Sequence, residues 1–320
     1  MRTIMALAGA VLAGFASLGA AEAQEWPKKQ PIKIVVGAAA GGGTDVLARV
    51  TAEFLQRRLC QAVVVENKLG AGASIAVDYV AKSPPDGYTL LLIFNDLVIY
   101  PAVRGDLPYK YDQMTYLIRP FVVPPVLFVG PKVQAKTAQE FIAHMKANPG
   151  KVRYGSAGVG GLMHLGIAKF EAAIGVKGAH VAYTGAAPVY QDMLGGVLDF
   201  TMATPPNPDG LRVLASAGTK RHPLHPDAPT LAELGVKGAE WEPAAGFVGP
   251  PKMPKELTDR VIAELSAVMK DPEAIAKLQS AAKFTPDPQA PTGEAYKAMM
   301  VTEHNEWKAI VEREKIVVQQ

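Results

Sequence analysis

Two stretches of the chain share one pattern: a short apolar run, a cluster of glycines, and then apolar residues at helical spacing. In the first stretch the apolar run precedes Gly37-Ala-Ala-Ala-Gly-Gly-Gly-Thr-Asp45, and the helical spacing begins at Val46. In the second it precedes Gly155-Ser-Ala-Gly-Val-Gly-Gly161, and the helical spacing begins at Leu162. Each stretch therefore predicts a strand, a glycine-rich turn and a helix, in that order.

A turn of this kind is suited to binding an anion. The first N–H groups of a helix have no partner within the helix, and that end carries a partial positive charge. Glycine lets the backbone approach a ligand closely. Two such turns facing each other would hold a small carboxylate or another oxyanion from two sides, so the sequence predicts a two-sided anion-binding site.

The N-terminus predicts a secretory signal peptide over residues 1–23. Arg2 supplies a basic start, residues 4–18 are apolar and small, and Ala21-Glu-Ala23 fits a small-x-small cleavage site. The alternative is a membrane anchor, but the apolar run is shorter than the ~20 residues that a span needs. We expect an exported, soluble mature protein that begins near Gln24.

Composition excludes several classes of protein. The net charge is +3, and it is unchanged without the signal peptide, which holds one Arg and one Glu. No block of Lys or Arg is present, so we expect no nucleic-acid partner. The single cysteine, Cys60, excludes an internal disulfide and a cysteine-based metal site; we expect it to be a buried thiol at a helix end, with a reactive thiol as the alternative. His222 and His225 lack a third ligand, so we expect no metal and no cofactor.

Strands alternate with helices along the chain, which is typical of a doubly wound, mostly parallel sheet. The pattern restarts near Val126, so we expect two lobes, each with its own sheet. The expected strands are 32–36, 62–66, 89–94, 126–129, 152–154, 180–183, 199–202, 211–215 and 245–248. The expected helices are 45–59, 73–81, 138–147 capped by Thr137, 162–173, 187–194, 231–234, 256–269, 272–281 and 293–314.

An enzyme is the weaker interpretation. Gly155-Ser-Ala-Gly158 is similar to the nucleophile elbow of hydrolases, but Tyr154 stands where that motif needs glycine. Neither loop completes G-x-G-x-x-G, because Val46 and Met163 occupy the required positions, and no P-loop lysine follows either loop. We expect no catalytic residues, and an exported hydrolase stays a minor alternative.

The motifs together resemble the Bug-type periplasmic solute receptors, which serve tripartite tricarboxylate transporters. The resemblance follows the mature chain in order, through Gly41–Arg49, Val64–Gly72, Pro85–Leu91, Ala147–Lys151, Ser156–Gly160 with His164, His180–Pro188, Asp192–Asp199 and Asp227–Glu233. It implies a two-lobed, type II-like periplasmic binding-protein fold with the ligand in a cleft. The expected lobes are 24–124 with 247–320 (lobe 1) and 125–246 (lobe 2).

The resemblance also implies the ligand-binding residues. On one side these are Gly41, Gly42, Gly43, Thr44 and Asp45; on the other they are Ser156, Ala157, Gly158, Gly160, His164, Thr184 and Gly185. Asp45 is expected mainly to orient its loop, because it would repel an anion directly. For His164, a ligand-facing donor and a core histidine that bonds to the loop are both open.

The chain departs from the family pattern at several positions. Gly37-Ala38-Ala39-Ala40 replaces a proline-rich run, Gly161 stands where serine is frequent, and Thr184 replaces a lysine-like position. These changes favour an aliphatic dicarboxylate or an aromatic acid over citrate-like ligands. We expect a monomeric periplasmic receptor that delivers this carboxylate to the membrane subunits of the transporter; a receptor that presents its ligand to a sensor kinase or regulator is the alternative.

Overall fold

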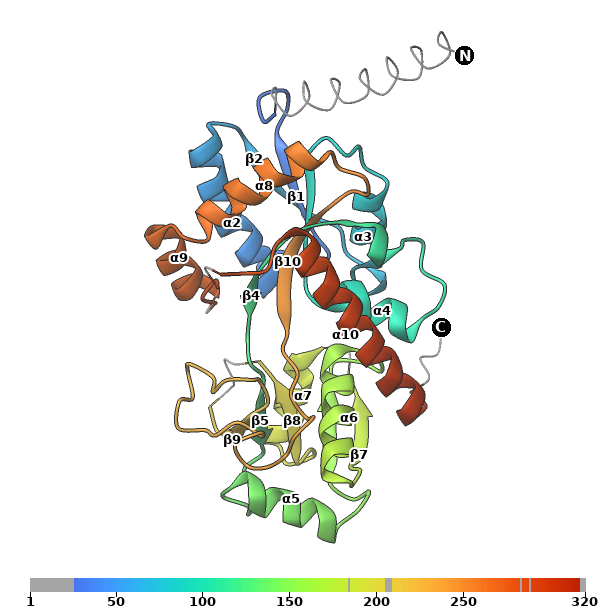
Figure 1. Ribbon diagram of the computed structural model, residues 1–320. Helices are drawn as coiled ribbons and strands as arrows, with labels where there is room; N and C mark the ends of the chain where they lie inside the picture. Colours follow the sequence, from blue (N-terminus) through green and yellow to red (C-terminus); the bar gives the residue numbers. More distant parts are fainter. Residues whose placement is uncertain (1–25, 184, 205–208, 283, 288, 317–320) are drawn as a thin grey trace. The chain divides into compact units, whose positions relative to one another are not determined.

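The computed structural model (Figure 1) describes the whole chain apart from residues 1–25, 184, 205–208, 283, 288 and 317–320. The expected signal peptide and Thr184 therefore lie outside the described residues. Within the described part, no helix is both long enough and apolar enough to cross a membrane.

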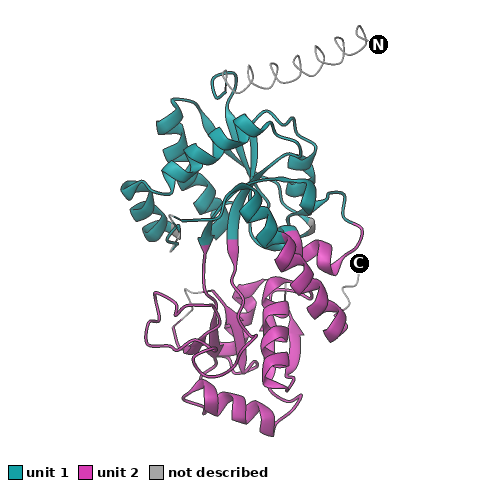
Figure 2. Cartoon of the chain, in the orientation of Figure 1, with its two compact units in different colours: residues 1–97, 107–121, 245–300 teal, residues 98–106, 122–244, 301–320 magenta. Residues whose placement is uncertain are grey.

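The chain divides into two compact units. Unit 1 comprises the described residues within 1–97, 107–121 and 245–300, and unit 2 those within 98–106, 122–244 and 301–320 (Figure 2). The chain therefore passes from one unit to the other five times. The expected lobes place 98–106, 122–124 and 301–320 in lobe 1 and 245–246 in lobe 2, whereas this division assigns the first three segments to unit 2 and the last to unit 1.

The sheet of unit 1 has the strand order β2-β1-β3-β10-β4. β1 pairs in parallel with β2 and with β3, whereas β10 runs antiparallel to β3. The parallel strands are joined through helices, as βαβ units require. The strands are β1 (Ile32–Val36), β2 (Val63–Asn67), β3 (Thr89–Ile93), β4 (Thr115–Val122) and β10 (Ala244–Gly249), and the helices between the parallel strands are α2 (Gly43–Leu59) and α3 (Ser74–Ala81).

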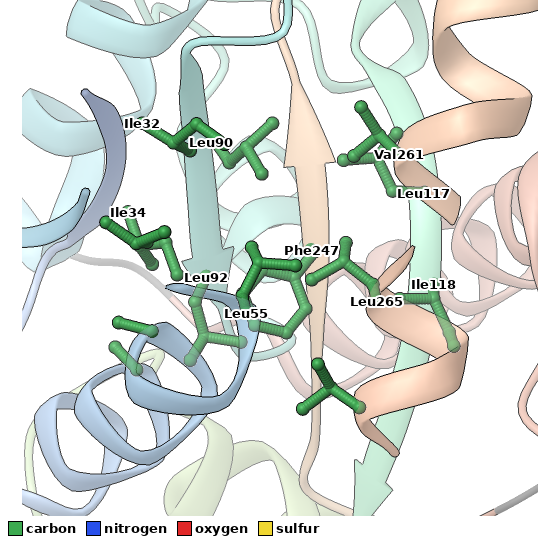
Figure 3. Packing of buried hydrophobic residues seen from close by; sticks show 14 of the residues in the cluster. Ile32, Ile34, Leu55, Leu90, Leu92, Leu117, Ile118, Phe247, Val261 and Leu265 are labelled. Atoms are coloured by element: carbon green, nitrogen blue, oxygen red, sulfur yellow. The ribbon is translucent and has the colours of Figure 1, made fainter. Parts of the chain in front are cut away.

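The core of unit 1 lies between this sheet and the helices α2 and α8 (Lys255–Val268). Figure 3 shows apolar side chains of the strands meeting those of the two helices, among them Leu92, Phe247, Leu55 and Leu265. Each of these side chains is buried, and burial of one such side chain stabilises the fold by roughly 1.5–3 kcal/mol. This packing holds the start of α2 at the end of β1.

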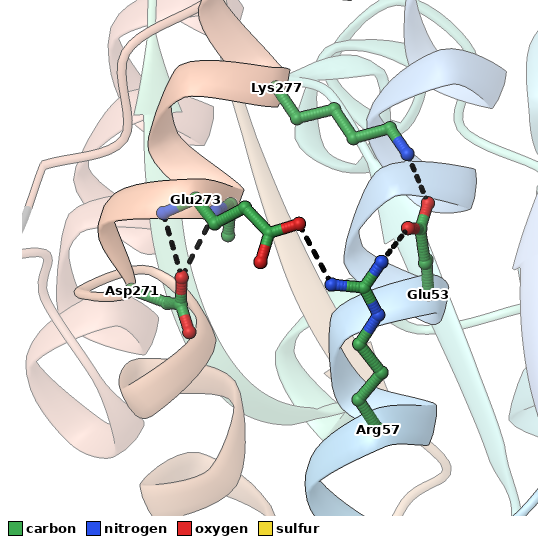
Figure 4. A network of polar contacts seen from close by, with 6 residues as sticks. Glu53, Arg57, Asp271, Glu273 and Lys277 are labelled. Carbon is green, nitrogen blue, oxygen red and sulfur yellow. Dashed lines mark hydrogen bonds and ion pairs between the residues drawn. The ribbon is translucent and has the colours of Figure 1, made fainter.

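Ion pairs join α2 to α9 (Pro272–Ala282) on the surface of unit 1 (Figure 4). Arg57 donates to Glu273 at 2.9 Å and to Glu53 at 2.6 Å, and Lys277 donates to Glu53 at 2.5 Å. Asp271 caps α9 by accepting from two backbone N–H groups at its start. These charges are exposed, so each pair contributes only about 0–1 kcal/mol.

The sheet of unit 2 has the order β7-β6-β8-β5-β9. β6 pairs in parallel with β7 and β8, while β5 runs antiparallel to β8 and β9. The strands are β5 (Val126–Val129), β6 (Arg153–Ser156), β7 (Ala179–Ala182), β8 (Phe200–Ala203) and β9 (Arg212–Ser216), and the helices are α5 (Ala138–Ala147), α6 (Leu162–Ile174) and α7 (Ala186–Leu194). In each sheet, the strand that leads into a glycine-rich loop, β1 or β6, is therefore parallel to both of its neighbours.

Several local expectations were wrong or incomplete. Residues 231–235 form turns and not a helix. Cys60 is exposed in a left-handed conformation at the end of α2, and not buried. The sequence patterns missed β4 and three helical segments, namely α4 (Asp96–Val103) and the short 3-10 helices Ala71–Ala73 and Tyr111–Gln113; the last helix, α10 (Gly293–Glu314), has the expected bounds.

Candidate functional site

The first glycine-rich loop joins β1 to α2 in unit 1. Gly41 has a φ of 80°, which favours glycine, and Gly42 is the N-cap of α2. The Gly42 N–H donates to the Ala39 carbonyl at 3.0 Å, which closes the turn. The N–H groups of Gly43 and Thr44, at the start of α2, have no partner among the described residues. The start of α2 therefore offers open backbone donors.

Asp45 holds this loop in shape from behind. Its carboxylate is only 1% exposed and accepts from the Gly41 N–H at 2.9 Å. Arg49 binds both carboxylate oxygens, at 2.8 and 2.9 Å, and Asn67 donates to Oδ1 at 2.8 Å. The pKa of Asp45 is lowered to about 2, mainly by the hydrogen bonds from Arg49. Burial acts in the opposite direction and raises the pKa. Asp45 thus orients the loop, as expected, and all its acceptor sites face protein donors.

A close approach between two segments supports the same loop. A Cβ atom built on Gly37 would lie 2.3 Å from the Cβ of Ala73 and 2.8 Å from its Cα. Only glycine fits there without displacement of the segment before α3. Asn67, at the end of β2, also donates to the Ala38 carbonyl at 2.8 Å. At the carboxyl edge of the sheet the loop therefore packs against the segment before α3 and is hydrogen-bonded to the end of β2.

The second glycine-rich loop joins β6 to α6 in unit 2. Ala157 and Val159 are exposed, whereas Gly158 and Gly160 adopt φ angles of 138° and 74°. The Gly161 N–H donates to the Gly158 carbonyl at 3.4 Å, and Gly161 is the N-cap of α6. Like α2, α6 begins with backbone N–H groups that have no partner among the described residues. The two loops are thus alike in local geometry.

Ser156 and His164 face inward from this loop. Ser156 is fully buried, and its Oγ lies 2.7 Å from Nε2 of His180 on β7. The Gly160 N–H donates to Nδ1 of His164 at 3.0 Å, and the His164 and His180 rings stack with centroids 3.9 Å apart. His164 therefore occupies the core position that bonds to the loop. The Ser156 hydroxyl is buried, although its distance to His180 is that of a nucleophile and base.

A third loop ends at Gly185, the N-cap of α7. Space around Gly185 is open, since a Cβ atom there would meet nothing within 4 Å. Tyr183, at the end of β7, donates to Asp192 at 2.5 Å, and its backbone N–H donates to the Ser156 carbonyl at 2.9 Å. The loops after β6 and β7 therefore lie side by side, and unit 2 presents two helix starts at one sheet edge.

The sequence patterns missed three supporting residues: Arg49, Asn67 and His180. The i, i+4 spacing of Asp45 and Arg49 is a signal that points to their ion pair. Asn67 and His180 stand on the strands that follow each loop, and only the parallel pairing of those strands brings them to it. Among the described residues, no group of three or more His, Cys, Asp or Glu side chains could hold a metal ion.

Comparison with known proteins identifies the family. The model of the tripartite tricarboxylate transporter family receptor matches residues 47–316. A protein encoded in the gbd 5' region of Cupriavidus necator is 33% identical over 317 residues, which are 98% of this chain and 95% of that protein.

Solved structures agree with this family and with the two-unit fold. The periplasmic binding protein BugD is 28% identical with a TM-score of 0.75, covering 91% of this chain and 99% of BugD. Rpa4515 of R. palustris, solved with adipate, is 27% identical with a TM-score of 0.78 over 91% of this chain and 99% of its own. The resemblance drawn from the motifs is confirmed: the chain belongs to the tripartite tricarboxylate transporter receptor family, whose members are two-lobed, non-enzymatic solute-binding receptors.

Proposed function

We propose that this protein is a periplasmic receptor that binds a small carboxylate and delivers it to a tripartite tricarboxylate transporter. The single observation that carries the proposal is the pair of glycine-rich helix starts, one in each unit, with open N–H groups at the start of α2 and α6. Family membership supports export to the periplasm and the transporter as partner. One chain supplies both loops, so the receptor acts as a monomer.

The ligand carboxylate accepts hydrogen bonds from the N–H groups of Gly43 and Thr44 in unit 1 and of Leu162 and Met163 in unit 2. Hydrogen bonds to a charged acceptor contribute about 1.5–3 kcal/mol each when they are shielded from water. The ligand shifts the receptor toward its bound conformation by the difference in its affinity for the two states. Gly41, Gly42, Gly158, Gly160 and Gly185 allow the close approach.

The remaining part of the ligand contacts an apolar surface. Val159 is 42% exposed at the tip of the second loop, and Met163 packs with Tyr183 and Tyr190 against the apolar core of unit 2. Ala157 is also exposed, whereas the polar side chains of Ser156 and His164 are turned inward. This surface favours an aliphatic dicarboxylate or an aromatic acid, and the adipate bound to Rpa4515 is an aliphatic dicarboxylate. Thr184 is proposed to contact the far end of the ligand.

Calorimetric titration of the mature protein with aliphatic dicarboxylates, citrate and aromatic acids tests this function. Gly43→Val and Gly161→Val add bulk beside the two helix starts, and neither glycine has a positive φ or a neighbour closer than 3.5 Å to the new Cβ. We expect each substitution to weaken ligand binding by about tenfold or more, because the added bulk would prevent one charge-assisted hydrogen bond to the ligand.

Gly105→Val is the matched control, because Gly105 is exposed, has open space around it and lies outside both loops. It should bind with unchanged affinity. Unchanged binding by well-folded Gly43→Val and Gly161→Val would overturn the two-loop site, and citrate as the tightest ligand would overturn the proposed ligand class.

A further inference from the structure

Two imidazoles, those of His164 and His180, make hydrogen bonds to the second loop. His180 contacts Ser156 where the loop begins, at 2.7 Å, and His164 accepts from Gly160 where it ends, at 3.0 Å. The two imidazole rings are parallel within 13°, and the Tyr154 ring lies beside both, with its centroid 4.9 Å from that of His180 and 6.4 Å from that of His164. The two ends of the loop are therefore hydrogen-bonded to one stacked pair of imidazole rings.

The two contacts differ in how they respond to a proton. The backbone N–H of Gly160 can only donate, so Nδ1 of His164 must carry a lone pair and the neutral ring carries its proton on Nε2. A protonated His164 would place one N–H against another and lose the bond. The Ser156 hydroxyl can donate or accept, so its contact with His180 survives in either state. His164 is the proton-sensitive member of the pair.

The surroundings keep His164 neutral. Burial, the neighbouring His180 and Lys177 together lower the pKa of His164 to about 4, and burial also lowers the pKa of His180. Tyr154 stays neutral because burial raises the pKa of its phenol. Glu171, a buried carboxyl on the same helix, accepts from the Gly178 N–H at 2.6 Å. Burial, His180 and Lys177 thus oppose a positive charge on the His164 ring.

We propose that His164 is a positioning residue: its neutral imidazole fixes the Gly160 amide and with it the shape of the second loop, and protonation of the ring releases that end of the loop. The consequence for ligand affinity rests on the proposed function. The hydrogen bond and its response to acid do not, so they can be tested without any ligand.

The first experiment follows the imidazole and amide resonances of the isotopically labelled mature protein by NMR. At pH 7 we expect the His164 ring in the form protonated at Nε2. On acidification, the Gly160 amide shift should change together with the His164 ring near pH 4. The Ile32 amide, which donates to the Ala62 carbonyl in unit 1, is the internal reference and should not move with it. A ring protonated at Nδ1 at pH 7, or a Gly160 amide that ignores the titration, would overturn the proposal.

The second experiment compares His164→Asn with His164→Leu at pH 7. Asparagine can place an acceptor oxygen near the position of Nδ1, whereas leucine fills space without an acceptor. We expect faster hydrogen exchange at the Gly160 amide and about tenfold weaker adipate binding in the leucine variant, from the loss of one buried hydrogen bond, with near wild-type values in the asparagine variant. Equal exchange and equal affinity in the two folded variants would refute the positioning role. Absence of adipate binding by the wild type would count against the proposed ligand class, and the exchange result would still decide the role of His164.

Discussion

Replacement of Asp45 by asparagine tests how the first loop is held. Both carboxylate oxygens accept from donors: Oδ2 from Gly41 and Arg49, and Oδ1 from Arg49 and Asn67. An amide in either orientation therefore turns its NH2 group toward a donor. Asp45→Asn changes the shape of the side chain little, but it leaves one donor beside this buried side chain without an acceptor.

The magnitude follows from the pKa of Asp45, which is about 2 in the folded protein against an ordinary value of 3.8. The difference corresponds to about 2 kcal/mol in favour of the charged, folded form. Because the folded pKa is lowered, this stabilisation is present above pH 3.8 and disappears as the pH falls through about 2. At pH 7 we expect Asp45→Asn to cost about 2 kcal/mol, or roughly 4–8 °C in the melting temperature of unit 1. Arg49 is half exposed, so the lower end of the range is expected.

Urea and thermal unfolding at pH 7 measure this cost, with Asp259→Asn as control. Asp259 also pairs with a basic residue four positions away, Lys255, but both side chains are exposed. The control should lose no more than about 0.5 kcal/mol. An Asp45→Asn protein as stable as the control at pH 7 would show that the buried carboxylate does not stabilise the loop.

Two further substitutions probe local packing and burial. Gly37→Ala should destabilise unit 1 by about 1–3 kcal/mol in urea unfolding, because its Cβ would overlap Ala73. The control Gly43→Ala adds a Cβ that meets no neighbour, so its free energy of unfolding should stay within about 0.5 kcal/mol of wild type. Equal unfolding midpoints for the two variants would contradict the close approach of Gly37 and Ala73. Burial raises the pKa of Glu171 to about 7, so its ionisation opposes folding as the pH rises from 4.5 through 7. Glu171→Gln should therefore raise the free energy of unfolding relative to wild type by up to about 3 kcal/mol at pH 8. At pH 4 it should leave this free energy unchanged, because the amide oxygen can still accept from the Gly178 N–H. A stability gain that does not depend on pH would refute the role of Glu171 ionisation.

Regular sequence patterns predicted some elements with the bounds that the structure has. β1, α5 and α10 have the expected bounds, and Thr137 caps α5 by accepting from Glu140 at 3.2 Å. α4 was missed because its sequence is almost wholly apolar and contains Pro101, so it shows no helical period. β4 was missed because Arg119 and Pro120 interrupt its apolar run, although Arg119 is buried in the structure.

The loops themselves were predictable, but the orientation of their side chains was not. Glycine clusters at the ends of apolar runs indicated both turns. Ser156 and His164 face inward because His180, which lies 24 residues beyond Ser156, and the Gly160 amide supply partners there. No local pattern links residues so far apart, since their contact is created by the parallel pairing of β6 with β7.

The position of β10 has a consequence for how the molecule is made. β10 lies between β3 and β4, yet residues 122–243 of unit 2 are all synthesised before it. The ribosome therefore completes this long stretch before the fourth strand of the sheet exists. Until then one edge of β3 is unpaired and β4 has no neighbouring strand in the sheet. A nascent chain cut short before Ala244 would keep those edges open, so correct folding of the N-terminal half depends on a strand encoded in the last quarter of the gene.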